Sequence, residues 1–103
     1  MTHPVRFRAD ARRDMLQATR WLKDIAADQA RRFTDDAHTT AEALGAFPEA
    51  HPVLRGDARR VALGVFKYHL WYTIEDGTVW IVAVVHQSRG PDYLKRRIGK
   101  TQK

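Results

Sequence analysis

The sequence contains no cysteine, which excludes disulfides and any zinc site built from thiolates, and which fits a reducing compartment. It has five histidines, and no two of them have the i, i+4 spacing with which paired histidines hold a metal on one helical face. They are His3, His38, His51, His69 and His86. We therefore predict that the protein has no metal site and needs no cofactor.

Long apolar runs are also missing. The longest is the seven-residue stretch Val79–Val85, whereas a membrane-spanning helix needs about 20 apolar residues. The N-terminal residues, Met1 to Arg8, lack the apolar core of a secretion signal. These absences predict a protein that does not contact a membrane and that lies in the cytoplasm.

Charge, in contrast, is abundant and unevenly placed. The chain has 103 residues, of which 44% are hydrophobic and 29% charged, and this composition predicts a single globular domain over residues 1–103. The net charge is +6, and residues 86–103 carry six Lys and Arg against one Asp, a local charge of +5. Residues 27–50 carry two Arg against five Asp and Glu, a local charge of −3. This asymmetry suits an acidic partner, either a nucleic acid or an acidic protein segment, although a solubilising tail has the same composition.

Hydrophobic periodicity predicts a short strand at residues 5–8 and then two helices. Asp10 can cap the first helix, and the second is predicted to start at Asp28 and to stop at Gly45, before Pro48. The apolar face of the first helix holds Met15, Ala18, Leu22 and Ile25. The apolar face of the second holds Ala30, Phe33, Ala37, Ala41 and Leu44. The link between them is short, which predicts an antiparallel helix hairpin.

The second half of the chain has the period of strands. Residues 48–58 are predicted to form a loop, and residues 59–63 and 68–75 to form strands. The pair Asp76-Gly77 is a hairpin turn signal, and residues 78–85 are apolar on both faces, which indicates a central strand. We therefore predict an α+β fold in which an N-terminal strand and a helix hairpin precede an antiparallel sheet, with the hairpin on one face. Trp71 then lies on the other face, which only the basic C-terminal segment or a partner could cover.

The ordered set of these residues resembles the RelE/ParE superfamily of toxins from bacterial type II toxin–antitoxin pairs, and the resemblance covers nearly the whole chain. In the helical half the matching pieces are Ala11-x-x-Asp14-Met15-x-x-Ala18-x-x-Trp21-Leu22, Ala30-x-x-Phe33 and Leu44-x-x-Phe47-Pro48. In the strand half they are Arg59-Arg60-Val61, Tyr68-x-Leu70-x-Tyr72-x-Ile74 and Val84-Val85-His86-x-x-Arg89-x-Pro91.

The resemblance implies one of two activities. RelE-like members are ribosome-dependent endoribonucleases that cut mRNA, whereas ParE-like members poison DNA gyrase and have no established hydrolytic chemistry. Both are neutralised by a small antitoxin that wraps the toxin, so the resemblance also implies an acidic antitoxin and a toxin–antitoxin hetero-oligomer. The residues predicted to contact partners are Trp71, Arg89, Tyr93, Lys95, Arg96 and Arg97.

A metal-free nuclease would need a base, an acid and cations around the phosphate. His86 could exchange the proton, Arg89 could hold the phosphate, and Tyr93 could donate a proton or stack on a base. Arg60 would supply one of the basic side chains that RelE-like nucleases present from their middle strands. If the protein is a nuclease, these four residues are its candidate catalytic set.

Three departures from the nuclease pattern favour the ParE side. The second basic position, two residues after Arg60, is Ala62, and the third is His69. Tyr93 follows Arg89 by four residues, which is closer than the nuclease spacing. A methyl group cannot neutralise a phosphate, and the His-x-x-Arg-x-Pro ending is more similar to ParE-like toxins. We therefore predict a gyrase poison rather than an enzyme, with a ribosome-dependent mRNA endoribonuclease as the alternative and a plain nucleic-acid-binding domain as a third class.

Overall fold

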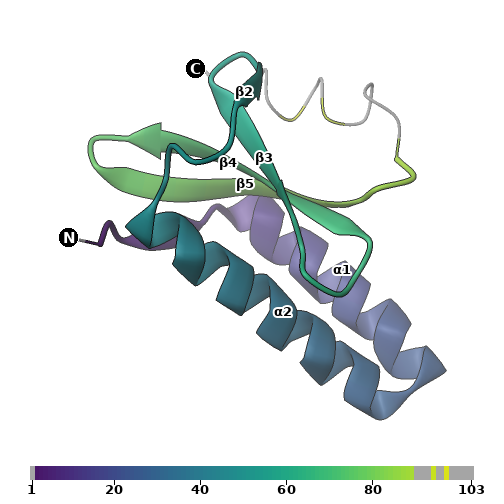
Figure 1. Cartoon of the computed structure of the whole chain (residues 1–103). Helices are drawn as coiled ribbons and strands as arrows, with labels where there is room; N and C mark the ends of the chain where they lie inside the picture. Colours follow the sequence, from purple (N-terminus) through teal and green to yellow (C-terminus); the bar gives the residue numbers. More distant parts are fainter. Residues whose placement is uncertain (1, 90–93, 95–96, 98–103) are drawn as a thin grey trace.

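The computed structural model describes residues 2–89, 94 and 97, which form two helices and five strands (Figure 1). In chain order the elements are β1 (Val5–Phe7), α1 (Ala9–Ile25), α2 (Ala27–Ala46), β2 (Val53–Arg55), β3 (Ala58–Ala62), β4 (Tyr68–Glu75) and β5 (Thr78–His86). The two helices run antiparallel and lie side by side along one face of the sheet (Figure 1). The predicted α+β fold with a helix hairpin on one face is confirmed.

The sheet is mixed, and its strand order is β1-β5-β4-β3-β2. β1 pairs parallel with β5, whereas the other neighbouring strands are antiparallel. The three strands predicted at residues 59–63, 68–75 and 78–85 pair antiparallel as expected. The sequence left the pairing of β1 open, since a three-residue strand carries no signal of its pairing direction. The predicted loop at residues 48–58 contains β2, which is also too short for an alternating pattern to show in the sequence.

The helix starts differ from the predicted ones. α1 begins at Ala9, and the residue that caps it is Arg8, whose side chain makes no capping hydrogen bond, so the prediction of Asp10 as the cap is wrong. Asp10 lies in the first turn, where a negative charge is favourable beside the unpaired backbone N–H groups. α2 begins at Ala27, one residue before the predicted start.

Gly45 lies inside α2, which ends at Ala46, and so does not stop the helix as predicted. The N-terminal segment crosses α2 at this point, because the backbone N–H of His3 donates to the carbonyl oxygen of Gly45 at 2.7 Å. A Cβ atom at position 45 would stand 2.7 Å from the carbonyl oxygen of His3. Glycine is therefore needed for the close approach of the two backbones.

The turn between β4 and β5 is formed by Asp76 and Gly77, as predicted. Both residues have positive φ angles, 51° and 77°, and Glu75 pairs with Thr78 across the turn. These are the backbone conformations that a two-residue hairpin turn with the right-handed twist of its strands requires. The local Asp-Gly signal was sufficient because the turn depends on no distant contact.

A bulge in the middle of β5 decides which of its residues face the helices. Trp71 of β4 pairs with Ala83, but the next residue of β4 pairs with Ile81, so Val82 is an extra residue in β5. The insertion reverses the alternation along the strand. Beyond it, Val84 belongs to the core beneath the helices.

The sheet has a hydrophobic core on each face. The core beneath the helices includes Phe33 and Leu70, and the core on the opposite face includes Trp71 and Val82. Trp71 is only 6% exposed, so this face is covered at Trp71, and the sequence left that cover to the C-terminal segment or a partner. Leu94, from the C-terminal segment, is buried in the same cluster and supplies part of the cover.

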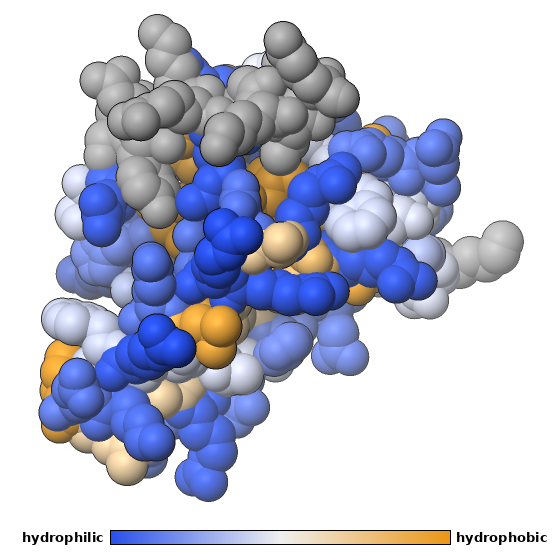
Figure 2. Space-filling model, turned by 180° about the vertical axis from the view of Figure 1, so that it is seen from behind, coloured by the Kyte–Doolittle hydropathy of each residue, from blue (hydrophilic) through white to orange (hydrophobic). Residues whose placement is uncertain are grey.

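Viewed from behind, the surface is mainly hydrophilic, with hydrophobic residues in separate patches (Figure 2). The large apolar side chains that remain exposed include Trp21 and Ile25 on α1 and Val65 between β3 and β4. Within the described part of the chain, no helix has both the length and the apolar character that crossing a membrane requires.

Candidate functional site

The predicted site residues line two pockets near the C-terminal end of β5. The first, the helix cleft, lies between α1 and β5 and is lined by Asp14, Gln17, Ala18, Trp21, Tyr68, Val84, Val85, His86, Ser88 and Arg89. The second, the sheet pocket, lies on the face away from the helices and is lined by Leu54, Arg55, Arg60, His69, Trp71, Val85, Gln87, Arg89 and Leu94. Of the candidate catalytic residues, only Arg89 lines both pockets.

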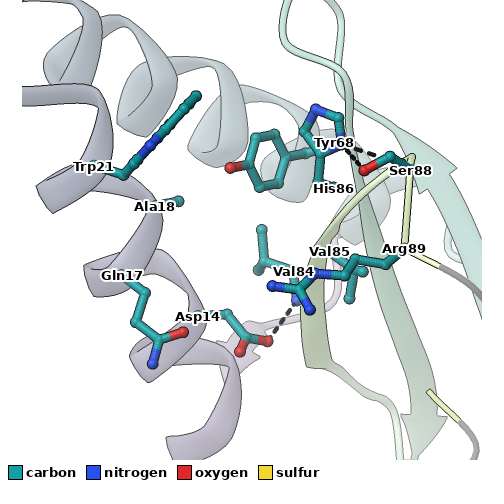
Figure 3. Close-up of a pocket in the computed structure, with 10 residues that line it drawn as sticks. All are labelled: Asp14, Gln17, Ala18, Trp21, Tyr68, Val84, Val85, His86, Ser88 and Arg89. Carbon is teal, nitrogen blue, oxygen red and sulfur yellow. Dashed lines mark hydrogen bonds between the residues drawn. The ribbon is translucent and has the colours of Figure 1, made fainter. Parts of the chain in front are cut away.

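The helix cleft has a volume of about 400 Å³ and mixed chemistry. One wall is α1, and the other comes from the start of β4 and the end of β5 (Figure 3). Figure 3 shows the hydroxyl of Tyr68 pointing toward Trp21 and the guanidinium of Arg89 extending toward α1. Trp21 is 60% exposed, so its indole ring can be reached by a ligand or a partner.

The imidazole of His86 is held by the turn that follows β5. The backbone N–H of Ser88 donates to Nδ1 of His86 at 3.0 Å, and the hydroxyl of Ser88 lies 2.8 Å from the same nitrogen. A backbone N–H can only donate, so Nδ1 accepts and the neutral ring carries its hydrogen on Nε2. The ring also stands edge-on to Tyr68, with 5.1 Å between the ring centroids. His86 is thus a well-anchored part of the turn, whose Nε2 nitrogen can donate to a ligand.

Tyr68 is neutral in the cleft. Burial raises the pKa of its phenol, and the nearby positive charge of Arg89 opposes that rise in part. The phenol packs edge-on against Phe33 of α2, with 4.8 Å between the ring centroids. This residue therefore joins the cleft to the core.

Arg97 is bonded to Asp14, one of the residues that line the helix cleft. Its guanidinium donates to both carboxylate oxygens of Asp14, at 2.8 and 3.2 Å, and to the carbonyl of Val82 at 3.3 Å. The same carboxylate accepts the backbone N–H of Val84 at 2.9 Å. These bonds satisfy the edge of β5 beyond the three residues that pair with β1. The side chain of Arg97 is only 16% exposed, and its contact with a partner stays a prediction.

The sheet pocket has a volume of about 350 Å³ and is strongly basic. Arg55, Arg60 and His69 reach it from three successive strands, β2, β3 and β4. The guanidinium of Arg60 lies over the ring of Trp71, 5.6 Å from its centroid. Arg55 was missed from the sequence because it falls in the stretch predicted as a loop.

His69 is the ionisable group whose pKa departs from its ordinary value in this pocket. Burial lowers the pKa of its imidazole, and the positive charge of Arg60 lowers it further. His69 pairs across the strands with Ala62, so the methyl group that replaces a basic side chain lies directly beside it. The pocket therefore presents a neutral imidazole between arginines near neutral pH.

The candidate catalytic residues do not all line the same pocket. Arg60 lines the sheet pocket and His86 lines the helix cleft. Tyr93, Lys95 and Arg96 lie outside the described residues. Within the described part of the chain, no group of three or more His, Asp or Glu side chains could hold a metal ion.

A family model described as "ParE toxin of type II toxin-antitoxin system, parDE" matches residues 5–91. The chain belongs to the ParE toxin family. No curated protein sequence matches it closely enough to count as a relative.

Two solved structures have the same fold as this chain. The first is described as the chromosomal ParDE toxin–antitoxin system from P. aeruginosa; it has a TM-score of 0.73 and 11% identity, over 82% of this chain and 96% of that one. The second is the toxin–antitoxin complex RelBE2 from Mycobacterium tuberculosis, with a TM-score of 0.62 and 26% identity, over 84% of this chain and 99% of that one. The ParE-family fold predicted from the sequence is thereby confirmed.

Proposed function

We propose that this ParE-family toxin inhibits growth by poisoning DNA gyrase and that a cognate acidic antitoxin neutralises it in the cytoplasm. The choice of gyrase as the target rests on one observation: the candidate catalytic residues are divided between two pockets. Arg60 lines one pocket and His86 the other, and this separation supports a binding role over catalysis at a single phosphate.

Catalysis at one phosphate needs several side chains that converge on it. Cleavage of RNA without a metal requires an acid, a base and cations within reach of the same reacting group. In the sheet pocket the position beside His69 is the methyl group of Ala62, and in the helix cleft His86 is engaged by Ser88. Such surfaces suit binding to a protein target, where charge and shape matter more than proton transfer.

Induction of the toxin in growing cells tests this target. We expect a DNA-damage response and loss of supercoiling before the rate of protein synthesis falls. His86→Gln should then reduce toxicity only modestly, because it removes about one hydrogen bond, worth roughly 1 kcal/mol. Early arrest of translation with intact chromosomal DNA would contradict the proposal.

A ribosome-dependent mRNA endoribonuclease is the second candidate function. Two observations favour it: the 26% identity to the RelBE2 complex, and the gathering of Arg60, His69 and Arg89 around one pocket. In that case His69, whose neutral imidazole can accept a proton, replaces His86 as the candidate base. Cleavage of ribosome-bound mRNA by the purified toxin, lowered about 10²–10⁴-fold by His69→Gln but hardly by His86→Gln, would establish this alternative.

A further inference from the structure

We propose that the sheet pocket is an anion site that binds a carboxylate from an acidic segment of the antitoxin. The inference rests on the proposed function, since it names the place where the toxin's neutralising partner is anchored. It assigns the contact to Arg55, Arg60 and His69, in place of Trp71, which is buried.

The sheet pocket is lined by basic side chains. Two arginines and a histidine reach it from three neighbouring strands, and none of the described residues that line it is acidic. Among the described residues, no ion pair neutralises the charge of Arg55 or Arg60, and a ligand carboxylate would do so.

Arg60 is held in place by an aromatic ring. Its guanidinium rests over the ring of Trp71, which is itself fixed in the core of that face with Leu94. A guanidinium held in this way keeps its planar edge for a bidentate contact with a carboxylate. Less side-chain freedom is then lost when the ligand binds, which favours a specific contact over diffuse attraction.

The surroundings of the pocket favour a protein ligand over a nucleic acid. Proteins that bind single-stranded nucleic acids stack the bases on exposed aromatic rings. Two rings are found among the described lining residues: the indole of Trp71 is 6% exposed and lies beneath Arg60, and the imidazole of His69 is half-buried. The rim instead offers Leu54, which is 49% exposed, as a contact for an apolar side chain next to the acid. An acidic peptide segment with apolar neighbours fits both features.

Titration of the full-length toxin with hexaglutamate, followed by calorimetry at low salt, tests the site. The double variant R55Q/R60Q should bind the peptide at least about tenfold more weakly than the wild type, because it removes two charge-assisted contacts. The matched control is R31Q/R32Q on α2, which loses the same charge from exposed positions far from the pocket in the fold. It should change the affinity less than about threefold. A single-stranded RNA hexamer is titrated in parallel.

Equal loss of affinity in the two double variants would overturn the proposal, because binding would then follow net charge alone. Tighter binding of the RNA hexamer through Arg55 and Arg60 would also overturn it, in favour of a nucleic-acid site. If R55Q/R60Q does not fold, the ring-proton NMR signals of His69 in the wild type decide: they should shift with hexaglutamate, and constant signals would contradict the site.

Gyrase inhibition by the same wild-type protein separates this proposal from the proposed function. Inhibition of gyrase without binding of hexaglutamate overturns the pocket and leaves the target intact. Binding of hexaglutamate at Arg55 and Arg60 without inhibition of gyrase supports the pocket and removes the target.

Discussion

His69 shows how a single residue reports the electrostatics of the sheet pocket. Its pKa lies below the ordinary value of 6.5, because burial and the charge of Arg60 both disfavour the protonated ring. Arg60→Gln removes the second cause, so the pKa measured by NMR titration should rise toward 6.5 while burial keeps it below. Arg31→Gln, with the same loss of charge on α2, should leave the titration unchanged. An identical pKa in wild type and Arg60→Gln would show that the two side chains are not coupled.

The same pKa shift has a consequence for stability. The unfolded chain binds this proton more readily than the folded one, so the contribution of His69 is fully present above the unfolded pKa of 6.5. It is lost as the pH falls below that value and through the lower pKa of the folded state. The pH range in which His69 weakens the fold is therefore the mildly acidic one.

Gly45 supplies a second test at the scale of one residue. Replacing a helical glycine by alanine ordinarily stabilises a helix by up to about 1 kcal/mol. Here the new Cβ would stand 2.7 Å from the carbonyl oxygen of His3, and one of the two backbones would have to move. We expect Gly45→Ala to lower the free energy of unfolding by about 1–3 kcal/mol in urea titrations. A rise in stability would show that the N-terminal segment does not cross α2 there.

At the scale of elements, the contact between α1, the edge of β5 and the C-terminal segment depends on Asp14. Its carboxylate accepts bonds from Arg97 and from the backbone of Val84, and its side chain is only 6% exposed. Asp14→Ala would leave the N–H of Val84 without its acceptor and would remove two of the acceptor contacts of a largely buried guanidinium. We therefore expect a loss of about 3–5 kcal/mol in the free energy of unfolding.

Asp10 is the matched control for this prediction. It also lies beside Arg97, at 3.6 Å, but its side chain is 36% exposed. Solvent screens such a pair, so Asp10→Ala should cost less than about 1 kcal/mol. Equal costs for the two substitutions would mean that the edge of β5 is not held by Asp14.

At the scale of the whole molecule, the sequence was most informative where structure depends on neighbouring residues. The helix hairpin follows from the periodicity of residues such as Ala18 and Leu22, and the β4–β5 turn follows from Asp76-Gly77. Features that depend on distant residues were missed. The pairing of Asp14 with Arg97 spans 83 positions, and no local pattern indicates it.

The candidate site was predicted unevenly for the same reason. His86 and Arg89 both line the helix cleft, and the sequence brought them together because they follow a recognisable central strand. The sequence left open whether the C-terminal segment or a partner covers Trp71, because no local pattern shows that Leu94 packs in the same cluster. Arg55 could not be placed beside Arg60 either, because β2 is three residues long and its pairing with β3 is irregular.

The central claim, that this ParE-family toxin acts on gyrase, is tested most directly with purified components. Full-length toxin is added to DNA gyrase with relaxed plasmid and ATP, and the supercoiled and cleaved products are separated on agarose gels. We predict that supercoiling decreases and cleaved plasmid accumulates as the toxin concentration rises, and that His86→Gln retains most of this effect. Unchanged supercoiling at saturating toxin, together with cleavage of ribosome-bound mRNA by the same preparation, would contradict the account.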